Sequence, residues 1–227
     1  MERKKFIQKL GIGVVTPILT TSFMSCDKGD DIENMTPNTC SPSPSETAGP
    51  FPIKSPTERV RENIIGNRAG IPLVINFTIQ NSNNNCNPLE GVFVDIWQCD
   101  SKGNYSEYSD QLDGNFTNEH FLRGRQTTDA KGQVTFTSIY PGWYPGRAPH
   151  LHLEIKRGNA SLLVTQVAFP ENVSKIVYAT SNYKGDFDTA NTNDGEFRDS
   201  LSQNLADSVT GDTANGYTLK KVITVAG

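Results

Sequence analysis

The stretch Ile71-Pro-Leu-Val-Ile-Asn-Phe-Thr-Ile79 carries an apolar side chain at every second position. A repeat of two residues is typical of a β-strand with one buried face, because successive side chains of a strand point to opposite sides. Similar alternation, or a dense run of apolar and β-branched residues, recurs in further segments: 91–97, 133–140, 151–155, 162–169 and 217–225. Turn-forming residues separate them at 81–88, 100–103, 129–132 and 157–159. The sequence therefore predicts an all-β fold, a sandwich or a barrel.

Helical patterns are scarce, and only residues 196–209 are expected to form one or two helical turns. The chain has 227 residues, of which 20% are charged and 35% hydrophobic. This length is typical of one domain with a short extension, and this composition is typical of a soluble, turn-rich protein. The net charge is −4 and no basic block is present, so nucleic acid is not an expected partner.

The first 25 residues have the pattern of an export signal. Basic side chains cluster at its start, and an apolar run over residues 10–24 follows. That run is too short to span a bilayer comfortably, since a spanning helix needs about 20 apolar residues. It ends at Ser25-Cys26, which resembles a bacterial lipoprotein signal, in which the cysteine is lipidated and becomes the new N-terminus. The alternative is an ordinary secretory signal with an incidental cysteine.

We therefore expect an exported protein of the bacterial cell envelope, attached to a membrane only through a lipid at Cys26. Residues 26–48 contain almost nothing apolar and are rich in Pro, Ser, Thr and Asn, which predicts a flexible linker. Residues 49–227 remain as the folded domain.

Three further cysteines follow Cys26, and thiols tend to oxidise outside the cytoplasm. Cys99 lies on the same alternating strand face as Phe93 and Trp97, which predicts a packed thiol. Cys40 and Cys86 both lie in polar, turn-like sequence, and we predict a disulfide between them.

Two of the three histidines lie in His150-Leu-His152. On a strand this spacing places both imidazoles on one face, while Leu151 and Leu153 face the core. Two converging imidazoles are ready ligands for zinc, copper or iron. The alternative is a surface pair that arose by chance, which the flanking Gly, Pro and aromatic residues disfavour.

Two tyrosines are candidates for further ligands. Tyr105 follows the turn that ends the strand at 91–99, and Tyr144 lies in a Gly- and Pro-rich loop just before His150. A single tyrosine is usually a packing residue. Beside a trivalent cation, however, a phenol loses its proton, and the hard phenolate anion suits Fe(III). The Cys-x-x-Cys and His-Glu-x-x-His motifs of zinc sites are not present in the sequence.

The combination of motifs resembles the intradiol ring-cleavage dioxygenase family, in an exported branch. Residues 97–105, Trp-Gln-Cys-Asp-Ser-Lys-Gly-Asn-Tyr, resemble the strand and turn that carry the family's first tyrosinate, and Tyr140-Pro-Gly-Trp-Tyr144 looks like its second tyrosinate loop. Arg147-Ala-Pro-His-Leu-His152 resembles the family's Arg-x-x-His-x-His. The resemblance covers about residues 40–170, and its other segments are Glu46–Phe51, 121–136 and Thr165-Gln166.

This resemblance implies a Greek-key β-sandwich that holds one non-haem Fe(III) through Tyr105, Tyr144, His150 and His152. It also implies that O2 is inserted between the two hydroxyl-bearing carbons of a catechol, giving a muconate-type diacid. In that reaction Tyr144 would act as an internal base. Arg147 would place a fixed positive charge near the developing anion, and Gln166 would hydrogen-bond near the substrate ring.

Two other functions stay open at the level of sequence. One is a catalytically silent, exported β-sandwich that binds a polysaccharide or a partner, and the other is a zinc or copper protein that uses only the histidines. Among the remaining candidates, Trp97 and Trp143 are expected in the core and in the pocket wall. Glu154 is expected either to orient a histidine or to be a solvated strand residue, and His120 to be exposed without a role. Neither the catechol nor the oligomeric state is indicated.

Overall fold

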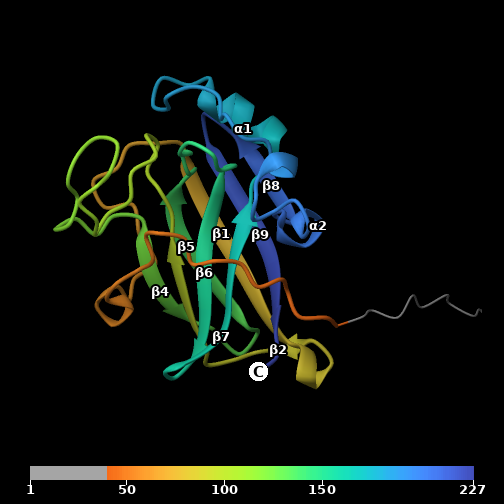
Figure 1. Ribbon diagram of the computed structural model, residues 1–227. Coiled ribbons are helices and arrows are strands. Elements are labelled where there is room, and N and C mark those ends of the chain that lie inside the picture. Colours follow the sequence, from red (N-terminus) through yellow and green to blue (C-terminus); the bar gives the residue numbers. More distant parts are fainter. Residues whose placement is uncertain (1–39) are drawn as a thin grey trace, which may run out of the picture. The chain divides into compact units, whose positions relative to one another are not determined.

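The computed structural model describes residues 40–227, which belong to one compact unit (Figure 1). The predicted export signal at 1–25, Cys26 and residues 27–39 of the predicted linker lie outside the described residues. Strands dominate the rest and form two sheets, so the predicted all-β sandwich is confirmed.

The first sheet is built around β1 (Pro72–Asn81), which pairs in parallel with β9 (Gly216–Val225) and antiparallel with β5 (Gln133–Ile139). Two short strands extend it, β2 (Asn87–Pro88) beside β1 and β8 (Ser208–Asp212) beside β9. The second sheet has the order β4-β3-β6-β7. Its strands are β4 (Arg123–Thr127), β3 (Phe93–Trp97), β6 (His150–Arg157) and β7 (Ala160–Ala168).

Two short α-helices follow β7, namely α1 (Glu171–Tyr178) and α2 (Leu201–Asn204). The 3-10 turns are η1 (Pro56–Glu58), η2 (Ser82–Asn84) and η3 (Asn191–Asn193). The sequence did not predict α1. It did predict helical turns over 196–209, where α2 is found, but residues 208–209 instead begin strand β8. Among residues 40–227, no helix is long and apolar enough to cross a membrane.

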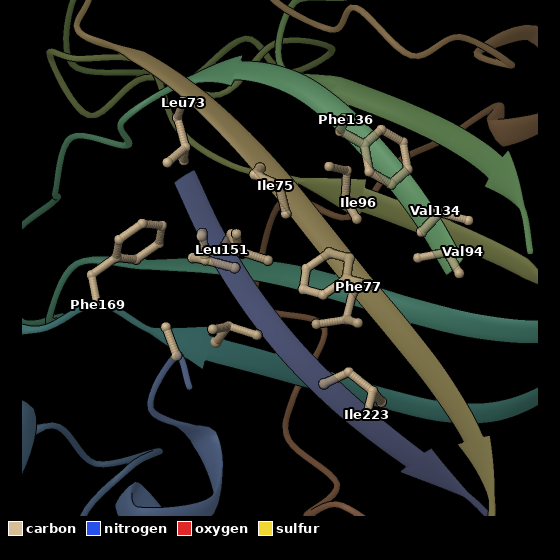
Figure 2. Packing of buried hydrophobic residues seen from close by; sticks show 14 of the residues in the cluster. Leu73, Ile75, Phe77, Val94, Ile96, Val134, Phe136, Leu151, Phe169 and Ile223 are labelled. Carbon is tan, nitrogen blue, oxygen red and sulfur yellow. The ribbon is translucent and has the colours of Figure 1, made fainter. Parts of the chain in front are cut away.

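The main core lies between the two sheets, as the alternation of the strands predicts. Leu73, Ile75 and Phe77 of β1 are at most 1% exposed and face the second sheet (Figure 2). Leu151 and Leu153 of β6 are fully buried in the same cluster. Since these leucines point inward, the side chains between them on β6 must point to the other face of the second sheet.

The N-terminal segment, residues 40–53, covers that other face of the second sheet. Its backbone follows β7, where Glu46 N donates to Val164 O at 2.9 Å, and its orange trace crosses the sheet in Figure 1. A disulfide joins Cys40 to Cys86, as predicted, and the buried Cys99 forms no bridge with another cysteine of residues 40–227. The prediction of a flexible linker through residue 48 is therefore wrong for residues 40–48. Polar composition concealed their anchoring, which uses backbone hydrogen bonds and a disulfide rather than apolar side chains.

Candidate metal centre

The two histidines of β6 lie side by side beneath the N-terminal segment. Their Nε2 atoms are 3.1 Å apart and their ring centroids 4.7 Å apart. The strand register places His152 between Trp97 on β3 and Gln166 on β7. Trp97 stacks on the His152 ring with an interplanar angle of 2° and a centroid distance of 5.3 Å. The predicted common face of the histidine pair is confirmed, and Trp97 fixes the plane of one ring.

Both imidazoles are neutral and ready to bind a cation. Nδ1 of His150 donates to the backbone carbonyl of Ala148 at 2.6 Å, which leaves the Nε2 lone pair free. Burial, followed by the positive charge of Arg147, lowers the pKa of His150 to about 3. Burial also lowers the pKa of His152 well below its usual value, with smaller contributions from His150 and Arg147. Neutral rings of this kind are the form that coordinates a metal.

The two tyrosines arrive from separate loops and meet beside the histidines. The ring centroids of Tyr105 and Tyr144 are 5.8 Å apart, and the Tyr144 hydroxyl lies 3.5 Å from His150 Nε2. The two loops approach each other closely at Gly103, which has φ +94°. A side chain at this position would collide with the backbone carbonyl of Trp143. A glycine is therefore required two residues before Tyr105.

Among residues 40–227, the buried hydroxyl of Tyr105 has no hydrogen-bond partner. An unpaired buried hydroxyl costs about 1–3 kcal/mol, so a bound ion or molecule at this position would be stabilised by it. Burial raises the pKa of Tyr105 well above its usual value, and burial also raises that of Tyr144. A bound cation would reverse both shifts by stabilising the phenolates.

These four side chains fit a hard, trivalent metal ion. His150 Nε2 lies 3.1 Å from His152 Nε2 and 3.5 Å from the Tyr144 hydroxyl. The Tyr105 ring packs on Tyr144 and His152, and such an ion would give its buried hydroxyl a partner. Within residues 40–227, no group of three or more His, Cys, Asp or Glu side chains gathers at a single point. The phenol side chains of Tyr105 and Tyr144 are the groups that lie beside the histidines.

Arg147 is held beside Tyr144 by a buried network. Its Nη1 donates to the Tyr144 hydroxyl at 3.2 Å, and its Nη2 donates to Oε1 of Gln166 at 2.6 Å. Its Nε donates to both carboxylate oxygens of Asp194, at 3.1 and 2.9 Å. The guanidinium therefore has a fixed position, and its positive charge opposes the rise in the Tyr144 pKa.

Gln166 belongs to the same network. Its Oε1 accepts from Arg147, and its Nε2 donates to the carbonyl of Thr47 at 2.8 Å. Gln166 therefore orients Arg147 and ties the N-terminal segment to β7.

Asp194 is a site residue that the sequence reasoning missed. It is fully buried and also accepts from the backbone N–H of Ala148 at 2.7 Å, two residues before strand β6 begins at His150. No local pattern marks it, because it lies 47 residues from Arg147 in a polar stretch. The sequence analysis assigned no acidic partner to Arg147. Because a buried guanidinium needs such a partner, Arg147 was the one indication that an Asp or Glu belongs to the site.

The other candidates take structural positions. Trp97 is 1% exposed in a cluster with Cys99 and Tyr105, as expected of a core residue, and Trp143 is partly buried against the main core. Glu154 pairs with Lys156 at 3.3 Å and has no hydrogen bond to a histidine. The side chain of His120 is 44% exposed and contacts Glu107 at 3.2 Å.

Comparison with known proteins identifies the family. Residues 51–183 match the family model described as Dioxygenase. The protocatechuate 3,4-dioxygenase beta chain of Burkholderia cepacia is 35% identical over 91 residues, which are 37% of this chain and 39% of that protein. Catechol 1,2-dioxygenase of Candida albicans is 31% identical over 98 residues, or 35% of this chain and 31% of that protein. The matches thus span less than two fifths of these curated relatives.

Solved structures match over a longer range. An intradiol ring-cleavage dioxygenase from Tetranychus urticae is 29% identical with a TM-score of 0.73, covering 82% of this chain and 95% of that one. The dioxygenase domain of a carbohydrate-binding fusion protein from Streptomyces sp. SirexAA-E is 27% identical with a TM-score of 0.59, covering 81% and 97%. Since the family model covers more than half of the chain, and the fold and the four converging side chains agree with it, this chain belongs to the intradiol ring-cleavage dioxygenase family.

Proposed function

We propose that this protein uses O2 to cleave the ring of a catechol-type substrate between its two hydroxylated carbons, with Fe(III) as its metal. The observation that carries the proposal is the cluster of His150, His152 and Tyr144, in which His150 Nε2 lies 3.1 Å from His152 Nε2 and 3.5 Å from the Tyr144 hydroxyl. The Tyr105 ring packs on this cluster, and its buried hydroxyl has no partner among the described residues. The family membership supports the same reaction class.

When bound by these four residues, Fe(III) would supply Lewis acidity toward the substrate oxygens. The protein contributes proton transfer and charge. Tyr144 is the more accessible tyrosine and lies at the mouth of a cavity, so its phenolate oxygen is placed to accept a proton from an incoming hydroxyl group.

Arg147 contributes a fixed positive charge to this step. Its Nη1 lies 3.2 Å from the Tyr144 oxygen, where it stabilises negative charge on the tyrosine or on a bound substrate anion. Because Asp194 and Gln166 hold the guanidinium in advance, no reorganisation is needed when charge develops.

Iron loading followed by an oxygen-uptake assay tests the proposal. The iron-loaded protein should be burgundy from tyrosinate charge transfer, and should consume O2 and a catechol in equal amounts to give a colourless diacid. Zinc-loaded protein is the matched control and should be colourless and inactive. A yellow semialdehyde would contradict intradiol cleavage. Iron binding with no oxygen uptake from a panel of catechols would instead indicate a catalytically silent binding protein.

A further inference from the structure

A cavity of about 490 Å³ opens beside Tyr144. Its volume falls in the range of about 300–1,000 Å³ that accommodates ligands larger than a single small ring. Tyr144 lines the cavity, and Phe51 in its wall packs on Tyr105 with a centroid distance of 5.1 Å, so the cavity adjoins the candidate metal centre. A catechol bound at the centre would leave most of this space for a ring substituent.

The wall of the cavity offers mainly apolar contacts. Phe51, Leu112 and Pro145 line it, and Leu112 is 59% exposed although it is a large hydrophobic residue. The polar residue Gln111 is already engaged, since its Oε1 accepts from Tyr105 N at 2.7 Å and its Nε2 donates to Asp110 O at 3.1 Å. An incoming substituent would therefore meet carbon atoms more often than free hydrogen-bonding groups.

The charges around the cavity disfavour a substrate carboxylate. Among the described residues that line the cavity, none is Lys or Arg, and the charged side chain is that of Asp110. Arg147 does not line the cavity, and the Lys184 ammonium lies over the Trp143 ring at 4.0 Å. A carboxylate on the substrate ring would lack a cationic partner and would face the negative charge of Asp110.

We propose that the preferred substrate is an uncharged catechol with an apolar substituent, which lies in this cavity against Phe51, Leu112 and Pro145. The inference rests on the proposed function, because it takes the catechol hydroxyls to be bound at the metal centre. It makes Leu112 and Asp110 specificity-determining residues.

Anaerobic binding titrations of the iron-loaded protein test this inference without turnover. Three probes suffice: catechol, a catechol that carries a propyl chain, and protocatechuate, which carries a carboxylate. The propyl compound should bind about tenfold or more tightly than protocatechuate, because a few buried methylene groups contribute this much. Equal affinity for the two compounds, or tighter binding of protocatechuate, would overturn the inference.

Two variants and one control locate the effect. Leu112→Ser should lower the affinity for the propyl compound relative to catechol about fivefold, through lost apolar contact. Ile176→Ser is the matched control, since Ile176 is 58% exposed on α1 and does not line the cavity, and it should leave that ratio unchanged. Asp110→Lys should raise the affinity for protocatechuate about fivefold at low salt, and added salt should remove the gain. Unchanged affinity ratios in both Leu112→Ser and Asp110→Lys would refute the assignment.

Turnover distinguishes this inference from the proposed function. If the binding preference is found but no catechol is cleaved, the cavity assignment holds and the proposed reaction fails. If catechol is cleaved and the propyl compound has no binding advantage, the reaction holds and the cavity assignment fails.

Discussion

Tyr105 and Tyr144 carry the same phenol but have different surroundings. Tyr105 is 1% exposed and its hydroxyl has no protein partner, whereas the Tyr144 hydroxyl accepts a hydrogen bond from Arg147 and lies at the cavity mouth. A tyrosine that exchanges a proton with a substrate must be accessible to that substrate. Accessibility therefore favours Tyr144 as the base and leaves the buried Tyr105 as a metal-binding group only.

We predict that Tyr144→Phe retains iron but lowers kcat by about a hundredfold or more, the usual contribution of a general base. Tyr105→Phe should mainly weaken iron binding and shift the charge-transfer colour, because it removes a buried anionic ligand. Metal analysis, visible spectra and oxygen uptake measure these effects. Tyr217→Phe, a change in the opposite sheet, serves as the control, and near-normal turnover in Tyr144→Phe would refute the base assignment.

Asp194 is predicted to act through Arg147. Asp194→Asn should lower kcat about tenfold, because the neutral amide holds the guanidinium less firmly and its aim at Tyr144 is lost. Asp95→Asn is the matched control, since Asp95 forms a similarly buried pair with Arg125 away from the centre. Both variants should lose thermal stability, but only Asp194→Asn should lose turnover. Equal kcat losses in the two variants would reduce Asp194 to a structural residue.

At the scale of elements, Glu107 joins residues 54–59, which follow the N-terminal segment, to the loop that carries Tyr105. Its carboxylate accepts from Lys54 N at 2.9 Å and from Arg59 Nε at 3.2 Å. Buried Arg123 lies 3.5 Å from the same carboxylate and donates to Phe51 O at 2.9 Å. Burial alone would raise the pKa of Glu107, but the Lys54 N–H, Arg123 and the other donors outweigh it and lower the pKa.

This lowered pKa predicts a dependence of stability on pH. The Glu107 carboxylate contributes fully above its unfolded value near 4.5, and the contribution is lost as the pH falls through the lower folded value. Urea unfolding at about pH 6 and about pH 3 measures the loss. In Glu107→Gln the fall in unfolding free energy between these pH values should be smaller than in the native protein, whereas an identical fall would show that other carboxylates account for it.

Alternating sequence predicted the strands that build the main core, because an apolar side chain at every second position identifies a half-buried strand. It missed β4, since Arg123 and Arg125 are buried through hydrogen bonds and an ion pair rather than through apolar character. It also missed α1, whose single buried face shows only Ser174, Val177 and Tyr178. Buried polar groups depend on distant partners, which local patterns do not contain.

The residues of the candidate site also fall into two groups, those that the sequence predicted and those that it did not. His150 and His152 could be predicted because their spacing on a strand fixes a common face, and the two tyrosines followed from family motifs. The residues that hold Arg147 and Gln166 beside these side chains come from remote segments. Thr47 lies 119 residues from Gln166, and Asp194 meets Arg147 only after the chain has folded around β7.

For the molecule as a whole, we propose export and attachment to a membrane through a lipid at Cys26, which lies outside the described residues. The basic and apolar start of the chain and the Ser25-Cys26 pair support the proposal. The Cys40–Cys86 disulfide supports an oxidising compartment.

Cys26→Ser should release the protein from membranes and leave its ring-cleaving activity in the soluble fraction. Fractionation with an oxygen-uptake assay measures this, and a variant with Cys99→Ser controls for the loss of a thiol. Native protein that is soluble and starts at a residue other than Cys26 would refute the lipid anchor. Membrane association that persists in Cys26→Ser would require another anchor.

One edge of β1 pairs with β9, which is the last strand of the sheet to be synthesised, so both edges of β1 are paired only after β9 has been made. Leu73–Asn81 pair in parallel with Tyr217–Val225, so nearly the whole domain is synthesised between the two partners. Until β9 leaves the ribosome, one edge of an apolar strand stays open, and open edges recruit strands from other chains. Chains that terminate before Gly216 are therefore expected to aggregate or be degraded rather than to persist as partial sandwiches. The chain is therefore most exposed to aggregation during its synthesis, because β1 is made early and its second partner is made last.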